Sequence, residues 1–127
     1  KFMQWKHANI CSDGNAGAHP RGYGSFTKIL GKYVREEKAL TLEEAIFKMT
    51  GLTAQHLGIK DRGTIASGMK ADLVLFNPKT VKDNASIRDS HALSDGIEMV
   101  WVNGELIYQG KKSTGKRSGT LIKRVNE

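Results

Sequence analysis

The sequence contains a single cysteine and no long apolar run. These two absences exclude a chain that is stabilised by internal disulfides or that contains a membrane-spanning helix. Cys11 has no second cysteine to pair with, so an internal disulfide is excluded and a reducing compartment suits the chain. No apolar stretch approaches the roughly 20 residues that a membrane-spanning helix needs. The first six residues lack the apolar core and the small-residue cleavage site of a signal peptide. We therefore expect a cytoplasmic protein with no membrane partner.

Acidic residues are also outnumbered, 13 against 20 lysines and arginines, which gives a net charge of +7. Five of these seven charges come from residues 111–127, where six basic residues stand against one acid. A basic tail of this kind can bind phosphates. However, no aromatic residue is interleaved with the charges to stack on bases. We interpret the tail as a solvated basic end and expect no nucleic-acid partner.

The first half of the chain predicts one short strand followed by helices. Residues 8–12 indicate a short buried strand that contains Cys11 and ends at Asp13-Gly14. Residues 13–25 are rich in glycine and predict a loop. Apolar residues then recur at helical spacing from Phe26 to Val34, which predicts an amphipathic helix that ends near residue 37. Thr41 and Glu44 have the spacing of a capping box at the start of the next helix.

Short strands separated by turns dominate the second half. The predicted strands cover residues 64–66, 72–76, 97–102, 105–108 and 120–122. Residues 73–76 are all apolar, which is typical of a strand buried on both faces. Asn103-Gly104 predicts a type I′ hairpin in which Trp101 faces Leu106 and Val100 faces Ile107. Because helices and strands are segregated rather than alternating, the predicted fold class is α+β.

Three groups of residues resemble the C-terminal part of amidohydrolase-superfamily enzymes, and most closely the D-aminoacylases, or N-acyl-D-amino-acid deacylases. The groups are Ser12-Asp13-Gly14 with HPRGYG at residues 19–24; LGKYVRE at residues 30–36 with LEEAIFKMT at residues 42–50; and LGIKDRGTI at residues 57–65, GMKADLVLF at residues 68–76 and VNG at residues 102–104. They cover nearly the whole chain. The HPRGYG and LGKYVRE stretches are the more specific to this branch.

The resemblance implies that the chain is a C-terminal fragment of a zinc-dependent TIM-barrel hydrolase. Residues 1–58 would be the end of the (β/α)8 barrel, with its last strand, catalytic loop and helices. Residues 59–127 would be the C-terminal part of a small β-sandwich domain. A barrel needs roughly 250 residues, so this chain cannot contain one. The implied partners are an N-acyl-D-amino-acid substrate and the missing N-terminal part of the enzyme, and sheet edges left open without that part allow a homo-oligomer.

Asp13 then stands where barrel enzymes place catalytic residues, at the carboxyl end of a strand. The matching Asp of the superfamily lies beside the metal, takes the proton of the attacking water and passes it to the leaving amine. Asp13 is therefore the implied catalytic residue and a possible zinc ligand. Arg21 could pair with a substrate carboxylate or could brace the loop, and His19 is a further candidate for substrate contact. The other zinc ligands have no counterpart here, so we expect the isolated chain to be inactive and to bind no zinc tightly.

Other interpretations remain open. On its own, Asp13-Gly14 is explained as well by an ordinary turn. The chain could also derive from another amidohydrolase, such as a hydantoinase or dihydroorotase relative, which the metal ligands of the missing barrel would reveal. From a different class, it could be a non-catalytic module that binds polyanions through its basic end, which the salt dependence of binding would test.

Overall fold

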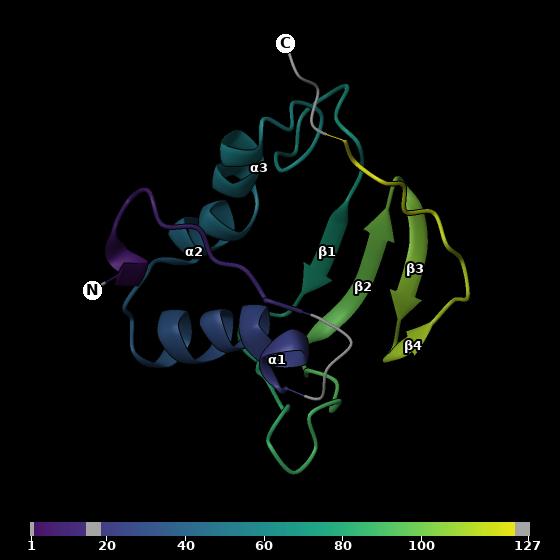
Figure 1. Ribbon diagram of the computed structural model, residues 1–127. Coiled ribbons are helices and arrows are strands. Elements are labelled where there is room, and N and C mark those ends of the chain that lie inside the picture. Colours follow the sequence, from purple (N-terminus) through teal and green to yellow (C-terminus); the bar gives the residue numbers. More distant parts are fainter. Residues whose placement is uncertain (1, 15–18, 124–127) are drawn as a thin grey trace.

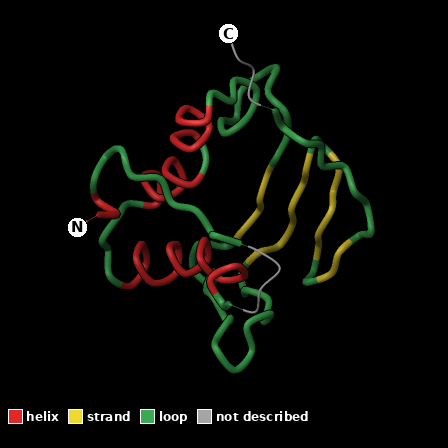
Figure 2. Tube along the Cα trace, in the orientation of Figure 1, coloured by secondary structure: helices red, strands yellow, loops and turns green. Residues whose placement is uncertain are grey.

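The computed structural model describes residues 2–14 and 19–123, and it separates them into a helical half and a sheet half (Figure 1). The helical half consists of the 3-10 helix η1 (Phe2–Gln4), α1 (Arg21–Lys28), the π-helix η2 (Ile29–Glu36), α2 (Leu42–Met49) and α3 (Gly51–Leu57). The sheet half consists of β1 (Leu73–Phe76), β2 (Ile97–Val102), β3 (Glu105–Gln109) and β4 (Lys112–Ser113). Figure 2 shows the helices gathered on one side and the strands on the other, so the predicted order of helices followed by strands is confirmed.

The first long helix begins at Arg21, so the predicted start at Phe26 was wrong. Pro20 occupies its N-cap position with φ −59°, and a proline can stand there because its missing N–H has no helical partner to lose. The two glycines at positions 22 and 24 argued for a loop. Gly24 is nevertheless buried, and a Cβ built on it would meet Asp83 Cβ at 3.0 Å. Close packing against a distant loop therefore overrides the weak local helix propensity.

The predicted capping box at the start of α2 is confirmed. The Thr41 side chain accepts a hydrogen bond from the Glu44 N–H at 3.1 Å, and the Glu44 carboxylate accepts one from the Thr41 N–H at 2.9 Å. Both unpaired donors at the helix start are thereby satisfied by local sequence. Helix α3 ends at Gly58, whose φ of 70° is the left-handed conformation that glycine adopts without strain.

The predicted strand over residues 8–12 does not form. The run of residues 8–14 has no regular secondary structure, and no described strand pairs with it. Its side chains alternate between half-buried at 8, 10 and 12 and exposed at 9, 11 and 13, so it has the pleat of a strand without the ladder. Cys11 is one of the exposed residues, which corrects the expectation that it is buried. A strand needs a neighbour to pair with, and the described residues offer none at this position.

The four strands form one antiparallel sheet in the order β1-β2-β3-β4. Asn103 and Gly104 both have positive φ, 50° and 82°, as the predicted type I′ turn requires. Trp101 pairs with Leu106 as predicted. Beyond that pair the register shifts at a bulge, so Val100 pairs with Tyr108 instead of Ile107. The turn thus sets the register only as far as the first irregularity of the ladder.

Three predicted strand features are wrong. Residues 64–66 and 120–122 form no strand. The third error concerns β1, whose first three residues are exposed, with Val74 at 54% and Leu75 at 45%. The apolar composition of β1 correctly predicts a strand, and it is typical of strands that are buried on both faces. The described part of this chain does not supply that cover, because its helices reach β1 only at Phe76, the last residue of the strand.

The hydrophobic core lies in the helical half and reaches the sheet half through Val81 and two residues at strand ends. The buried core residues are Ile29, Leu30, Leu40, Ala45 and Val81. Val81 is 1% exposed and follows β1, and Phe76 and Ile97 at the strand ends pack against the same cluster. Gly96 permits this close approach, because a Cβ there would lie 2.5 Å from the Val81 backbone and its φ is 77°. Arg35 closes the junction by donating hydrogen bonds to the carbonyls of Pro78 and Val81.

Candidate active site

Asp13 lies near the carboxyl end of the run 8–14, with its side chain 62% exposed. Its φ of 49° is in the left-handed region, which Asp tolerates better than most side chains. The Ser12 hydroxyl accepts a hydrogen bond from the Gly14 N–H at 3.2 Å and stabilises this local turn. The structure therefore presents the Asp13 carboxylate outward from a tight turn, where it is accessible to another molecule.

Arg21, the first residue of α1, reaches back to this turn. Its Nη2 lies 2.6 Å from Asp13 Oδ2, and the Arg21 side chain is 50% exposed. The pair joins the end of the run 8–14 to the start of a helix. Two residues that sequence analysis singled out separately are thus in direct contact, although an ion pair this exposed contributes little to stability.

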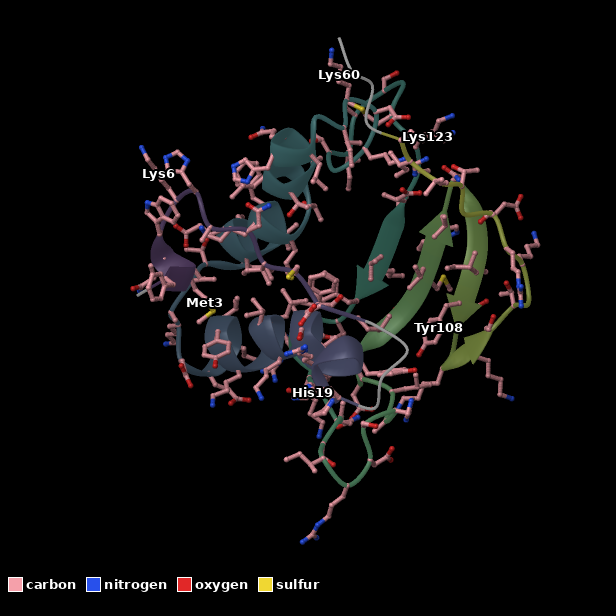
Figure 3. All side chains as sticks on the ribbon, in the orientation of Figure 1. Met3, Lys6, His19, Lys60, Tyr108 and Lys123 are labelled. Atoms are coloured by element: carbon pink, nitrogen blue, oxygen red, sulfur yellow. The ribbon has the colours of Figure 1, made fainter. Side chains whose placement is uncertain are left out.

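His19 lies beside the start of α1, as Figure 3 shows. Its Nδ1 accepts a hydrogen bond from the Arg21 N–H at 3.2 Å. Both residues line a pocket of about 150 Å³ that extends along α1 to the loop after β1. The other lining residues are Pro20, Gly24, Ser25, Lys28, Asp83 and Ala85. The pocket thus begins at Arg21, the partner of Asp13, and its charged lining consists of Arg21, Lys28 and Asp83.

Sequence analysis did not single out the two other charged residues of this pocket, Lys28 and Asp83. Lys28 lies seven residues after Arg21 on one continuous helix, so the two share a helix face. That relation could have been predicted only if the helix had been started at Pro20. Asp83, whose carboxylate lies 3.9 Å from Lys28 Nζ, comes from a loop about 55 residues further along the chain. No local pattern could have placed it there.

The described residues do not by themselves fit a metal ion. Across residues 2–14 and 19–123, no group of three or more His, Cys, Asp and Glu side chains converges on one point. A catalytic zinc needs about three protein ligands and a water. Asp13 supplies one exposed carboxylate, and neither His19 nor Cys11 belongs to a ligand cluster. Any metal beside Asp13 would need ligands from outside the described residues.

The arrangement brings together a proton carrier and a fixed cation. A carboxylate can accept and return a proton, and a guanidinium can hold an anion by two parallel hydrogen bonds. Because Asp13 and Arg21 are in contact, a molecule bound by Arg21 through its carboxylate would have its neighbouring atoms within reach of Asp13. The site is suited to an acid–base reaction next to a carboxylate.

The basic end of the chain is partly neutralised. Lys111 Nζ lies 2.5 Å from Asp95, and Lys116 pairs with Glu105. The hydrogen bond to Asp95 raises the pKa of Lys111. These pairs reduce the positive field that a polyanion would meet. No helix within the described ranges is both long and apolar enough to cross a membrane.

Comparison with protein-family models matches residues 8–108 to the Amidohydrolase family. The N-acyl-D-aspartate deacylase of Alcaligenes xylosoxydans xylosoxydans is 44% identical over 104 residues, which cover 82% of this chain and 21% of that protein. The solved structure of N-acyl-D-glutamate deacylase from Bordetella bronchiseptica is 43% identical with a TM-score of 0.72, and the match covers 77% of this chain and 21% of that one. That structure is complexed with zinc and a phosphonate inhibitor that mimics the tetrahedral intermediate.

A more distant relative comes from another branch. The dihydroorotase of Lactobacillus acidophilus is 26% identical over 98 residues, which cover 67% of this chain and 22% of that protein. Identity to the deacylases is therefore clearly higher than identity to this cyclic-amide hydrolase. The chain spans about a fifth of the length of the relatives it matches.

Proposed function

Because the chain belongs to the amidohydrolase family, we propose that it is the C-terminal part of a zinc-dependent enzyme that hydrolyses the amide bond of N-acyl-D-amino acids. The 44% identity to N-acyl-D-aspartate deacylase supports this activity over that of a dihydroorotase or hydantoinase. The pairing of Lys111 and Lys116 with acids argues against a polyanion-binding module.

The proposal includes two structural parts. Residues 1–58 are the end of a (β/α)8 barrel, and residues 59–127 are the C-terminal part of a small β-sandwich. The described helices of eight or more residues all lie within positions 21–49, and the described strands all lie within positions 73–113. This separation supports a boundary near Gly58. The exposed apolar faces of β1 and the unpaired run 8–14 are the features expected where neighbouring strands come from the rest of the enzyme.

The contact between Asp13 and Arg21 is the observation that carries the chemistry. In an N-acyl-amino acid, a single carbon separates the amide nitrogen from the carboxylate. A substrate held by Arg21 through that carboxylate therefore has its scissile amide next to Asp13. His19, which supports the Arg21 backbone and lines the same pocket, is placed to contact the rest of the substrate.

Asp13 serves this reaction as a proton shuttle. Its carboxylate takes a proton from the attacking water as the oxygen adds to the amide carbon. It then gives that proton to the amide nitrogen, because an amine leaves readily only when it is protonated. One group thus acts as base and then as acid, and it ends in the state in which it began. Among the described residues only Asp13 would hold the zinc that the proposal assigns to the whole enzyme, and its other ligands would come from outside these residues.

Two substitutions in the whole enzyme test these roles. Asp13→Asn keeps the shape of the side chain and removes its basicity, so we expect kcat to fall at least ~100-fold. Arg21→Met removes the carboxylate partner, so we expect KM for an N-acyl-D-amino acid to rise about tenfold or more, as for the loss of a charged hydrogen bond. Steady-state kinetics and circular dichroism measure activity and fold together.

Asp89→Asn is the matched control, since Asp89 is exposed in the loop after β1 and hydrogen-bonds Ser86 through its backbone. It should leave both kinetic constants unchanged. A folded Asp13→Asn enzyme with nearly parental turnover would show that Asp13 is not the proton shuttle.

A further inference from the structure

Lys48 is an unusual residue of the helical half, because it is a lysine that is only 5% exposed. It lies in the last turn of α2. Within the described ranges, no carboxylate lies close enough to its ammonium group to form an ion pair. A buried charge without an ionic partner is costly, and an apolar side chain such as Met would fill the same space without that cost.

The Lys48 ammonium group donates hydrogen bonds to the N-terminal segment. Nζ donates hydrogen bonds to the Trp5 carbonyl at 2.6 Å and to the Ala8 carbonyl at 3.3 Å. These carbonyls and the C-terminal end of the α2 dipole are the groups that offset its charge. The side chain therefore fixes two points of one segment.

The Lys48 backbone fixes a third point of the same segment. Its carbonyl accepts a hydrogen bond from the Ile10 N–H at 3.2 Å. This carbonyl is available because the helix breaks at Thr50, whose φ of −128° and ψ of −87° end α2 before a helical donor can reach back. In the described part of the chain, this is the one backbone hydrogen bond that ties residues 9–14 to a helix.

Asp13 follows three residues after Ile10, on a run that pairs with no described strand of this chain. We propose that Lys48 is a positioning residue for the hydrolysis: it anchors residues 5–10 to α2 and thereby sets where Asp13 stands relative to Arg21. This inference rests on the function proposed above. Lys48 touches neither substrate nor Asp13, and it acts only through the segment that it holds.

The first test uses the whole enzyme and measures amide hydrogen exchange by mass spectrometry, on peptides short enough to resolve Ile10. Lys48→Met removes both Nζ bonds, so we expect exchange at Ile10 to speed up at least tenfold while exchange within η2 stays unchanged. Lys32→Met is the matched control, because Lys32 is a half-exposed lysine on η2 that pairs only with Glu37 and the neighbouring Tyr33 ring. Unchanged exchange at Ile10 in a folded Lys48→Met enzyme would overturn the anchoring role.

The second test uses the whole enzyme and separates positioning from general stability. A catalytic group displaced by about 1 Å can cost up to 100-fold in rate, so we expect Lys48→Met to lower kcat 10- to 100-fold with KM nearly unchanged. If Lys48 acts through Asp13, the double variant Asp13→Asn/Lys48→Met should be no slower than Asp13→Asn alone. Lys48→Arg keeps a buried charge and several donors, so its kcat should fall less than that of Lys48→Met. This smaller decrease should also vanish in the Asp13→Asn background.

The outcomes distinguish this inference from the proposed function. A normal rate for Asp13→Asn would refute the proposed role of Asp13 as proton shuttle, and with it the role of Lys48 in positioning that residue, whereas an inactive parent enzyme would refute the proposed function. A slow Asp13→Asn enzyme combined with a normal Lys48→Met enzyme, or with losses that multiply in the double variant, would overturn the positioning role alone. If Lys48→Met does not fold, the same comparison with Lys48→Arg decides.

Discussion

At the scale of single residues, a polar cluster fixes the turn between β2 and β3. The Arg62 guanidinium pairs with Asp72 and donates a hydrogen bond to the Asn103 side chain at 2.6 Å. Asp72 in turn accepts a hydrogen bond from the Asn103 N–H at 2.7 Å. The Asn103 side chain also donates to the Ser118 carbonyl at 2.7 Å. Three positions distant in the sequence, Arg62, Asp72 and Ser118, are thereby joined through Asn103.

Burial by itself would raise the pKa of the Asp72 carboxyl, but the Asn103 N–H and the Arg62 guanidinium outweigh it and lower that pKa below its ordinary value. A lowered pKa in the folded state stabilises the fold above the unfolded pKa of about 3.9 and ceases to do so as the pH falls through the folded value. We therefore expect Asp72→Asn to be less stable than the parent chain at pH 7. Denaturant unfolding should show that the difference in free energy of unfolding between Asp72→Asn and the parent chain becomes smaller below pH 4.

Asp89→Asn serves as the control here as well, because its stability difference should stay near zero at every pH. If the loss of stability in Asp72→Asn stays constant from pH 7 to pH 2, the negative charge of the Asp72 carboxylate does not stabilise this cluster.

At the scale of elements, the β2–β3 hairpin depends on backbone conformation at its turn. Gly104 has φ 82°, and a Cβ built there meets no atom within 4 Å. A substitution at this position therefore tests the left-handed backbone alone, without a steric clash. A β-branched residue resists this conformation more than other side chains do.

We expect Gly104→Val to destabilise the chain by about 1–3 kcal/mol, the usual cost of a residue held in a left-handed conformation. Thermal unfolding followed by circular dichroism measures the loss. Gly119→Val is the matched control, because Gly119 does not have a positive φ and its built Cβ meets only Val102 at 4.0 Å. Equal melting temperatures for the two variants would contradict the type I′ turn.

At the scale of the whole molecule, apolar surface is left open on both halves. The strand β1 forms one edge of the sheet and exposes Val74 and Leu75, and the run 8–14 pairs with no described strand. Open edges with free N–H and C=O groups, combined with apolar side chains, promote association. The core of the helical half reaches the sheet mainly through Val81 and its neighbours.

We therefore expect this chain by itself to form dimers or larger species, to bind no zinc tightly and to lack deacylase activity. Light scattering measures association, and calorimetric titration measures zinc binding. Val74→Lys places a charge on the exposed face of β1 and should shift the chain toward monomer. A monomeric chain that binds one zinc tightly and cleaves N-acyl-D-amino acids would refute the proposal that it is part of a longer enzyme.

The sequence by itself determined the features that depend on a few neighbouring residues. The capping box needs only Thr41 and Glu44, and the hairpin turn needs only two residues that accept positive φ. The motifs around Asp13 also indicated the family, because they form short continuous stretches of sequence. Such features are local, so no distant contact is needed to form or to recognise them.

Only the tertiary structure decided the features that depend on distant groups. The start of α1 depends on Gly24 packing against Asp83, and the place of Asp13 depends on Lys48 and Arg21. The exposure of β1 likewise follows from which layers are present to cover it, a property that its apolar sequence does not contain. These contacts join residues far apart in the chain, and their free energy is gained only once the whole fold has formed, so no local pattern predicts them.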